Sequence, residues 1–183
     1  MKTKFFFIPL LLLFFACSKK IETSRSNEDS LTEVEEPRRP GKAFFDFDKV
    51  EHYSNDISES DAENLSIKDK PSKKESILSQ LLTEDDMEYT DELEKYNFKK
   101  SVINSSKLDS INKIFSENPC KTVYVTACIP VYRDIFIFKK NEKIVGKAKV
   151  CFGCRSYSIE GTKLNTENFG QCGDFERLGK LIY

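Results

Sequence analysis

The hydrophobic and polar positions of this chain fall into three successive patterns. Residues 5–15 carry no charge and are almost wholly apolar. Residues 18–42 are rich in Ser, Glu, Lys and Arg and have no apolar period. Such a segment cannot bury enough apolar surface to offset chain entropy, so we expect it to be disordered. Periodic apolar residues follow, and they predict one ordered domain over residues 43–183, best defined over residues 90–183.

Helical periodicity marks the middle and the end of this domain. The predicted helical segments are 77–82, a piece within 84–100, 108–115, and a last helix from 174. Ser105 or Ser106 is a suitable N-cap for the third segment, and Pro119 stops it. Asp174 is the expected N-cap of the last helix. The apolar residues of that helix share one stripe: Phe175, Leu178 and Leu181.

Strand-like runs rich in β-branched and aromatic residues predict the sheet. They are residues 44–50, 122–128, 131–138, 143–151 and 156–159. Asn141-Glu142 is a plausible two-residue turn, and pairing across it sets Asp134 opposite Lys149, where the two charges would form a salt bridge. The fold class that we predict is α+β: a small antiparallel meander sheet with packed helices, preceded by a disordered tether.

The charge distribution and the single histidine limit the function. The formal net charge is −1, but residues 76–118 sum to −4 and residues 119–183 to +5. We expect the acidic helices to pack over the basic strands, and we expect no nucleic acid partner. One histidine, His52, excludes a His-rich metal site and disfavours a His-based triad, and it lies outside the strongest part of the expected core. No phosphate-binding loop, HExxH or GxSxG motif occurs, so we assign no catalytic residue, no cofactor and no metal ligand.

The N-terminal apolar run is too short for a membrane-spanning helix, which needs about 20 residues, and follows a short basic segment. These features are typical of a signal peptide. Ala16-Cys17 after this run resembles the lipobox of bacterial lipoproteins, although Phe14 stands where Leu is usual. The resemblance implies a signal peptide over residues 1–16 and lipid attachment at Cys17. An ordinary secretory signal with a chance cysteine is the alternative.

The same resemblance places the chain in the cell envelope. Residues 17–42 would then be the lipidated cysteine and its linker, which holds the domain away from the lipid surface. Ser18, with no Asp in that position, resembles lipoproteins that are sent to the outer membrane. The implied partners are the membrane, through the N-terminal lipid, and another envelope protein.

Five cysteines remain in the domain, which is an odd number. They are Cys120, Cys128, Cys151, Cys154 and Cys172. Structural disulfides are the favoured interpretation in an oxidising compartment. Redox chemistry at the Cys151/Cys154 CxxC and a metal site of four cysteines, 120, 128, 151 and 154, are the alternatives. We expect Cys128 to bond to Cys151 or Cys154, and we take Cys172, in a loop, as the odd thiol.

The C-terminal half carries a second resemblance. The stretches ACIPVYRDIFIFKKNEKIVGKAKVCFGC and NTENFGQCGD resemble the C-terminal half of short lipoproteins and secreted proteins of Bacteroidota-type bacteria that have no known activity. Sequence alone therefore predicts a lipid-anchored envelope protein that acts as a non-catalytic binding or structural module. The alternatives are an extracytoplasmic thiol–disulfide redox protein and a Cys-ligated metal-binding protein.

Overall fold

The computed structural model describes residues 41–120 and 127–183, and all of them belong to one compact unit. The predicted signal peptide, the lipid-attachment cysteine and nearly all of the predicted linker lie outside the described residues. So does most of the predicted strand over residues 122–128, of which only the last two residues are described, and these are not in a strand.

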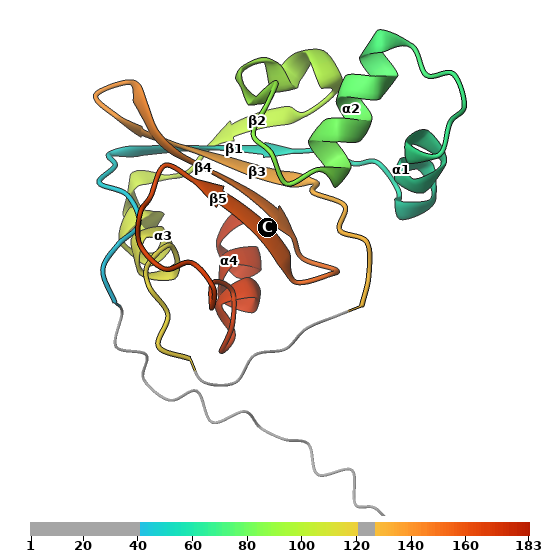
Figure 1. The fold of residues 1–183 in the computed structure, drawn as a ribbon. Helices are drawn as coiled ribbons and strands as arrows, with labels where there is room; N and C mark the ends of the chain where they lie inside the picture. The colour runs from blue at the N-terminus through green and yellow to red at the C-terminus, as the bar shows by residue number, and fades with distance from the viewer. Residues whose placement is uncertain (1–40, 121–126) are drawn as a thin grey trace, which may run out of the picture. The chain divides into compact units, whose positions relative to one another are not determined.

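The centre of the fold is a five-stranded antiparallel sheet with the order β2-β1-β3-β4-β5 (Figure 1). Its strands are β1 (Lys49–Ser54), β2 (Lys99–Val102), β3 (Asp134–Lys140), β4 (Lys143–Cys151) and β5 (Ser156–Glu160). The last three strands form the predicted meander, and β1 continues it on the other side of β3. With its helices, this sheet confirms the α+β class.

Helices lie on both faces of the sheet (Figure 1). The α-helices are α1 (Glu59–Ser66), α2 (Lys73–Thr83), α3 (Leu108–Ile114) and α4 (Asp174–Ile182), and the 3-10 helices are η1 (Thr90–Tyr96) and η2 (Ser105–Lys107). The apolar residues of α3 and α4 pack on one face, together with Val50 and Phe136. Those of α1, α2 and η1 pack on the other face, together with Tyr53 and Ile135.

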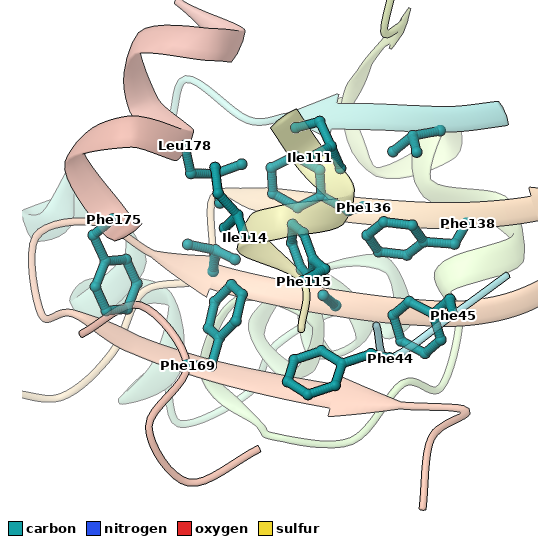
Figure 2. Packing of buried hydrophobic residues seen from close by; sticks show 13 residues of the cluster. Phe44, Phe45, Ile111, Ile114, Phe115, Phe136, Phe138, Phe169, Phe175 and Leu178 are labelled. Carbon is teal, nitrogen blue, oxygen red and sulfur yellow. The ribbon is translucent and has the colours of Figure 1, made fainter. Parts of the chain in front are cut away.

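Phenylalanine dominates the face of the sheet that α3 and α4 cover (Figure 2). The buried rings come from every part of the domain: Phe44, Phe45, Phe115, Phe136, Phe138, Phe169 and Phe175. Phe115 lies at the centre of this aromatic cluster, 4.7 Å from Phe138 and 4.8 Å from Phe169 between ring centroids. Tilted and edge-on ring pairs of this kind stabilise beyond the apolar area that they bury.

The hairpin register differs from the predicted one by one residue. Asn141 and Glu142 form the expected turn, both with positive φ. The ladder then shifts between Phe138 and Lys139, so Asp134 pairs with Val150 and not with Lys149. A shift of one residue moves a side chain to the opposite face of the sheet. The predicted salt bridge between Asp134 and Lys149 is therefore wrong.

Several predicted element boundaries also need correction. The first strand begins at Lys49, while Phe44 and Phe45 precede it as buried residues of an irregular segment. Asn104 caps the turn that leads into α3, because its side chain accepts from the Ser106 amide. Gly173 is the N-cap residue of α4, which makes Asp174 its first residue. The helix α1 was not predicted, because its only buried residue is an alanine.

Candidate functional site

Four of the five domain cysteines form two disulfides. Cys120 after α3 bonds to Cys172 before α4, with a Cα–Cα distance of 6.0 Å. Cys128 bonds to Cys154 in the turn between β4 and β5, with a Cα–Cα distance of 5.9 Å. The expected link from Cys128 to the CxxC unit is thus present. The expectation that Cys172 is the odd thiol is wrong, because Cys151 is the free cysteine among the described residues.

The disulfides also bear on the two alternatives for the CxxC unit. A site of four cysteines would need four thiolates, whereas Cys120, Cys128 and Cys154 are all bonded in disulfides. The Cys151 thiol is buried, and the amides of Val131 and Cys154 both donate to its sulfur at 3.4 Å. Two amide N–H groups therefore point to the Cys151 sulfur, and one of them belongs to Cys154 of the neighbouring disulfide, although no helix starts there.

Asp134 is the least exposed polar residue among those that line a hollow in the surface. It is 4% exposed at the start of β3. One carboxylate oxygen, Oδ1, lies 2.8 Å from Nε2 of His52 and accepts from the Tyr183 hydroxyl at 2.6 Å. The other oxygen, Oδ2, accepts no hydrogen bond from any described residue. A carboxylate has room for about four hydrogen bonds, so half of this acceptor is unused.

Two neighbours hold Asp134 in this position. His52 in β1 is buried and stacks on Phe136 at 4.8 Å between ring centroids, so it contacts the aromatic cluster although it was expected outside the strongest part of the core. Tyr183 reaches Asp134 from the end of α4. Tyr183 is 81% exposed, but its hydroxyl bonds to Asp134. The loss of solvent around this hydroxyl, and then the hydrogen bond to the Asp134 carboxylate, raise the pKa of Tyr183, so the hydroxyl stays protonated and donates.

A serine extends this polar chain on the far side of the imidazole ring. Ser101 Oγ in β2 lies 3.5 Å from Nδ1 of His52 and 3.3 Å from the His52 carbonyl oxygen. Ser101, His52 and Asp134 thus follow the order of a hydrolase triad, which the sequence argued against. The serine contact is at the outer limit of a hydrogen bond. Ser101 also lines neither of the two described hollows. We therefore assign to Ser101 and His52 the role of orienting the Asp134 carboxylate.

The hollow beside Asp134 has a volume of about 610 Å³ and lies between the start of β3 and α4. Aromatic side chains form one wall: Phe152 lies 6.3 Å from both Phe175 and Tyr183 between ring centroids. Gly179 in the middle of α4 also lines the hollow. A Cβ atom added there would meet only Phe152, at 3.8 Å, so the absent side chain leaves this part of the hollow open.

Charged groups surround the mouth of the hollow. Asp56 pairs with Lys99, and Glu176 pairs with Arg155. The single cation of the lining is Arg133, which lies 3.4 Å from a carboxylate oxygen of Glu59. Together with Asp134, three carboxylates and one guanidinium line the hollow. Its lining therefore favours a positively charged ligand.

Sequence reasoning pointed to the cysteines and missed most of this site. Phe175 belongs to the stripe that was predicted for α4, and Gly179 is a helix-interior glycine, which is a recognisable irregularity. His52 and Tyr183 had no sequence signal, because their roles depend on a contact with Asp134 across 82 and 49 residues.

No protein-family model matches the chain, and neither the curated proteins nor the solved structures contain a match. Within residues 41–120 and 127–183, no helix is long and apolar enough to cross a membrane. The same residues contain no group of three or more His, Cys, Asp or Glu side chains that could hold a metal ion.

Proposed function

We propose that the protein is a lipid-anchored binding module of the cell envelope, held by acyl chains on Cys17 and stabilised by two disulfides. The observation that carries the proposal is the pair of disulfides, Cys120–Cys172 and Cys128–Cys154. Stable disulfides are typical of exported proteins and rare in reducing compartments. Charged residues make up 32% of the chain, so the domain has few residues for its core. Each disulfide stabilises it by about 3–4 kcal/mol in the chain-entropy model at these loop lengths.

The hollow beside Asp134 supports binding over a purely structural role. It combines an aromatic wall with one enclosed carboxylate, which is the usual composition of a small-ligand site. The N-terminal lipid binds the membrane, and the anchored domain is placed to bind another envelope protein.

Fatty-acid labelling tests the anchor. Cells that express the full chain are grown with an alkyne-bearing palmitate, and the wild type is compared with Cys17→Ser. We expect label on the wild type alone, and mass spectrometry of the unreduced protein should show both disulfides. Equal labelling of the two chains would refute the anchor, and five free thiols in the domain would refute export to an oxidising compartment.

A second candidate function is thiol–disulfide exchange, which the surroundings of Cys151 favour. Cys151 would lose its thiol proton to solvent, and its sulfur would attack Sγ of Cys154. A Cys151–Cys154 bond forms, the Cys128–Cys154 bond breaks, and Cys128 leaves with the electron pair and takes up a proton. The step balances without an external oxidant, and it moves the thiol from a buried to an exposed position.

Alkylation distinguishes this exchange from a static disulfide. The native protein is treated with iodoacetamide and digested without reduction. Exchange predicts label on Cys128 in the wild type and none on Cys128 in the control Cys151→Ser. If native alkylation never reaches Cys128, the disulfide is only structural.

A further inference from the structure

Asp134 is a buried carboxylate whose hydrogen-bonding capacity is only half used. Its side chain is 6% exposed, and both of its described partners, His52 and Tyr183, bond to the same oxygen. A buried acceptor without a donor costs about 1–3 kcal/mol, and more when it is charged. Because Asp134 lines the hollow, a ligand that enters the hollow can supply the donor for Oδ2.

The aromatic wall limits the kind of donor. Phe152 and Tyr183 are oriented at 70° to each other and lie with Phe175 beside the same hollow. Aromatic faces attract organic cations within about 6 Å of a ring centroid, and the attraction grows when the cation is desolvated. A carboxylate with aromatic rings beside it therefore suits a positively charged amine that is attached to an apolar body.

The charges at the mouth act in the same direction. Asp56 and Glu176 are carboxylates, and each pairs with a cation that does not line the hollow, Lys99 and Arg155. Arg133 is the one opposing charge, and its guanidinium is turned to Glu59 and to the carbonyl oxygen of Ile57. Among the residues that line the hollow, a cation thus meets three carboxylates and one guanidinium.

Gly179 keeps this part of the hollow open and lowers the stability of α4. Glycine inside a helix is less favourable than alanine by about 1 kcal/mol. No close contact requires the glycine, since the nearest atom to an added Cβ would be at 3.8 Å. A longer side chain at this position of α4 would instead occupy the hollow.

We infer that the hollow between β3 and α4 binds an organic ammonium ion, a protonated primary amine on an apolar body, which donates to Oδ2 of Asp134 and lies against Phe152 and Tyr183. This inference rests on the proposed function as a binding module and names its ligand class. A primary amine fits better than a quaternary one, because only the former has hydrogen atoms to donate to the carboxylate.

The test compares three probes of the same shape and different charge. Phenethylamine is the cation, 2-phenylethanol is the neutral probe, and 3-phenylpropanoate is the anion. Each is titrated into the full-length protein with its disulfides intact, and binding is followed by two-dimensional NMR. We expect phenethylamine to bind at least tenfold more tightly than the other two, with shifts at Gly179 and Tyr183. Equal binding of the amine and the alcohol, or no binding of any probe, would overturn the inference.

Two variants locate the site. Asp134→Asn keeps the size of the side chain and should weaken phenethylamine binding at least tenfold. Because this change is buried and could unfold the domain, Gly179→Leu is the second variant: it leaves the carboxylate in place, favours the helix and should abolish binding. The matched control is Gly153→Ala, at an exposed turn outside the hollow, which should bind as the wild type does.

A folded Gly179→Leu protein that still binds the amine normally would refute the site. Failure of these titrations leaves the fatty-acid labelling and the disulfide mapping unaffected. The ligand class and the anchored, exported module can therefore fail independently.

Discussion

The two faces of the sheet are built on the same strands, and they bury different chemistry. The face under α3 and α4 is covered by phenylalanine rings (Figure 2). The face under α1 and α2 buries mainly aliphatic residues, with Tyr53, Tyr96 and Phe98 among them, and it also buries Glu51 and Lys149, which are 2% and 0% exposed. Strand β4 shows the contrast in neighbouring residues, since Ala148 and Val150 belong to the aromatic cluster while Lys149 points to the other face.

The buried charges on the second face are held by neighbours of opposite charge or by backbone. Glu51 lies 3.0 Å from both Lys100 and Lys139 and 3.5 Å from Lys49. Lys149 donates to the carbonyl oxygen of Glu84 at 2.9 Å. Lys147 in the same strand pairs with Asp91 at 3.2 Å, which confirms that acidic segments pack over basic strands. Both faces bury paired charge, because Asp134 with His52 lies on the face of α3 and α4. The faces differ in their apolar residues, since phenylalanine rings dominate the face of α3 and α4 alone.

Removing a central ring should have the largest effect of these changes. Phe115→Ala deletes a ring that contacts three others, and large-to-small changes of this kind cost about 3–5 kcal/mol. Leu81→Ala on the other face should cost less, about 3 kcal/mol. Urea unfolding of both variants measures the difference. Equal losses would show that the two faces do not differ in packing.

Glu51→Gln should have the next largest effect, a loss of about 3 kcal/mol, because it removes a buried carboxylate that three partly exposed lysine ammonium groups share. Burial alone would raise the pKa of Glu51, but hydrogen bonds from Lys139 and Lys100 outweigh it and lower the pKa to about 2. The unfolded chain therefore binds this proton first as the pH falls.

The stability from Glu51 is fully present above about pH 4.5 and is lost as the pH falls toward 2. Urea unfolding at several pH values in this window should show a smaller acid loss for Glu51→Gln than for the wild type. Parallel pH profiles would contradict the pairing.

Gly146→Ala should cost about 2 kcal/mol through overpacking of the aromatic face. A Cβ atom at this position of β4 would lie 2.2 Å from the ring of Phe45, which must then move. The control is Gly153→Ala, where an added Cβ atom would meet only the end of the Glu59 side chain, at 3.5 Å. If both alanines leave the melting temperature unchanged, the face is less tightly packed than its rings indicate.

Lys149→Met should have the smallest effect at neutral pH, within about 1 kcal/mol of the wild type, because replacing a buried charge by an apolar chain of similar size is often neutral or stabilising. Burial lowers the pKa of Lys149 below 10.5. The unfolded chain then holds this proton more tightly, so the wild type gains stability relative to the variant as the pH rises toward 10.5. Unfolding at pH 8 and pH 10 measures that gain, and a constant difference would contradict it.

Much of the secondary structure could be predicted from the sequence, because its signals are local. The turn at Asn141-Glu142 and the strand over Lys143–Cys151 need only neighbouring residues and a period of two. The helix α2 was predicted over residues 77–82 from its apolar repeat alone, whereas its start at Lys73, with a capping box of Ser72 and Glu75, was not predicted. The expectation of disulfides within the C-terminal half followed from compartment and number, and the structure bears it out.

The tertiary structure decided which residues meet. One extra residue in β4 shifts the register at Phe138 and Lys139, and this sends Asp134 toward α4 and Lys149 toward α2. No local sequence pattern predicts such a bulge, because it arises from packing on both faces of the sheet.

The tertiary structure also decided which residues far apart in the sequence are in contact. The choice of Cys151 as the free thiol depended on which sulfurs lie within bonding distance, and the site around Asp134 depended on a histidine from β1 and a tyrosine from α4. The sequence by itself determined most of the elements and the odd number of cysteines in the domain. Only the folded chain decided the pairs, because contacts between distant segments are set by the burial of the whole sheet and not by the residues beside them.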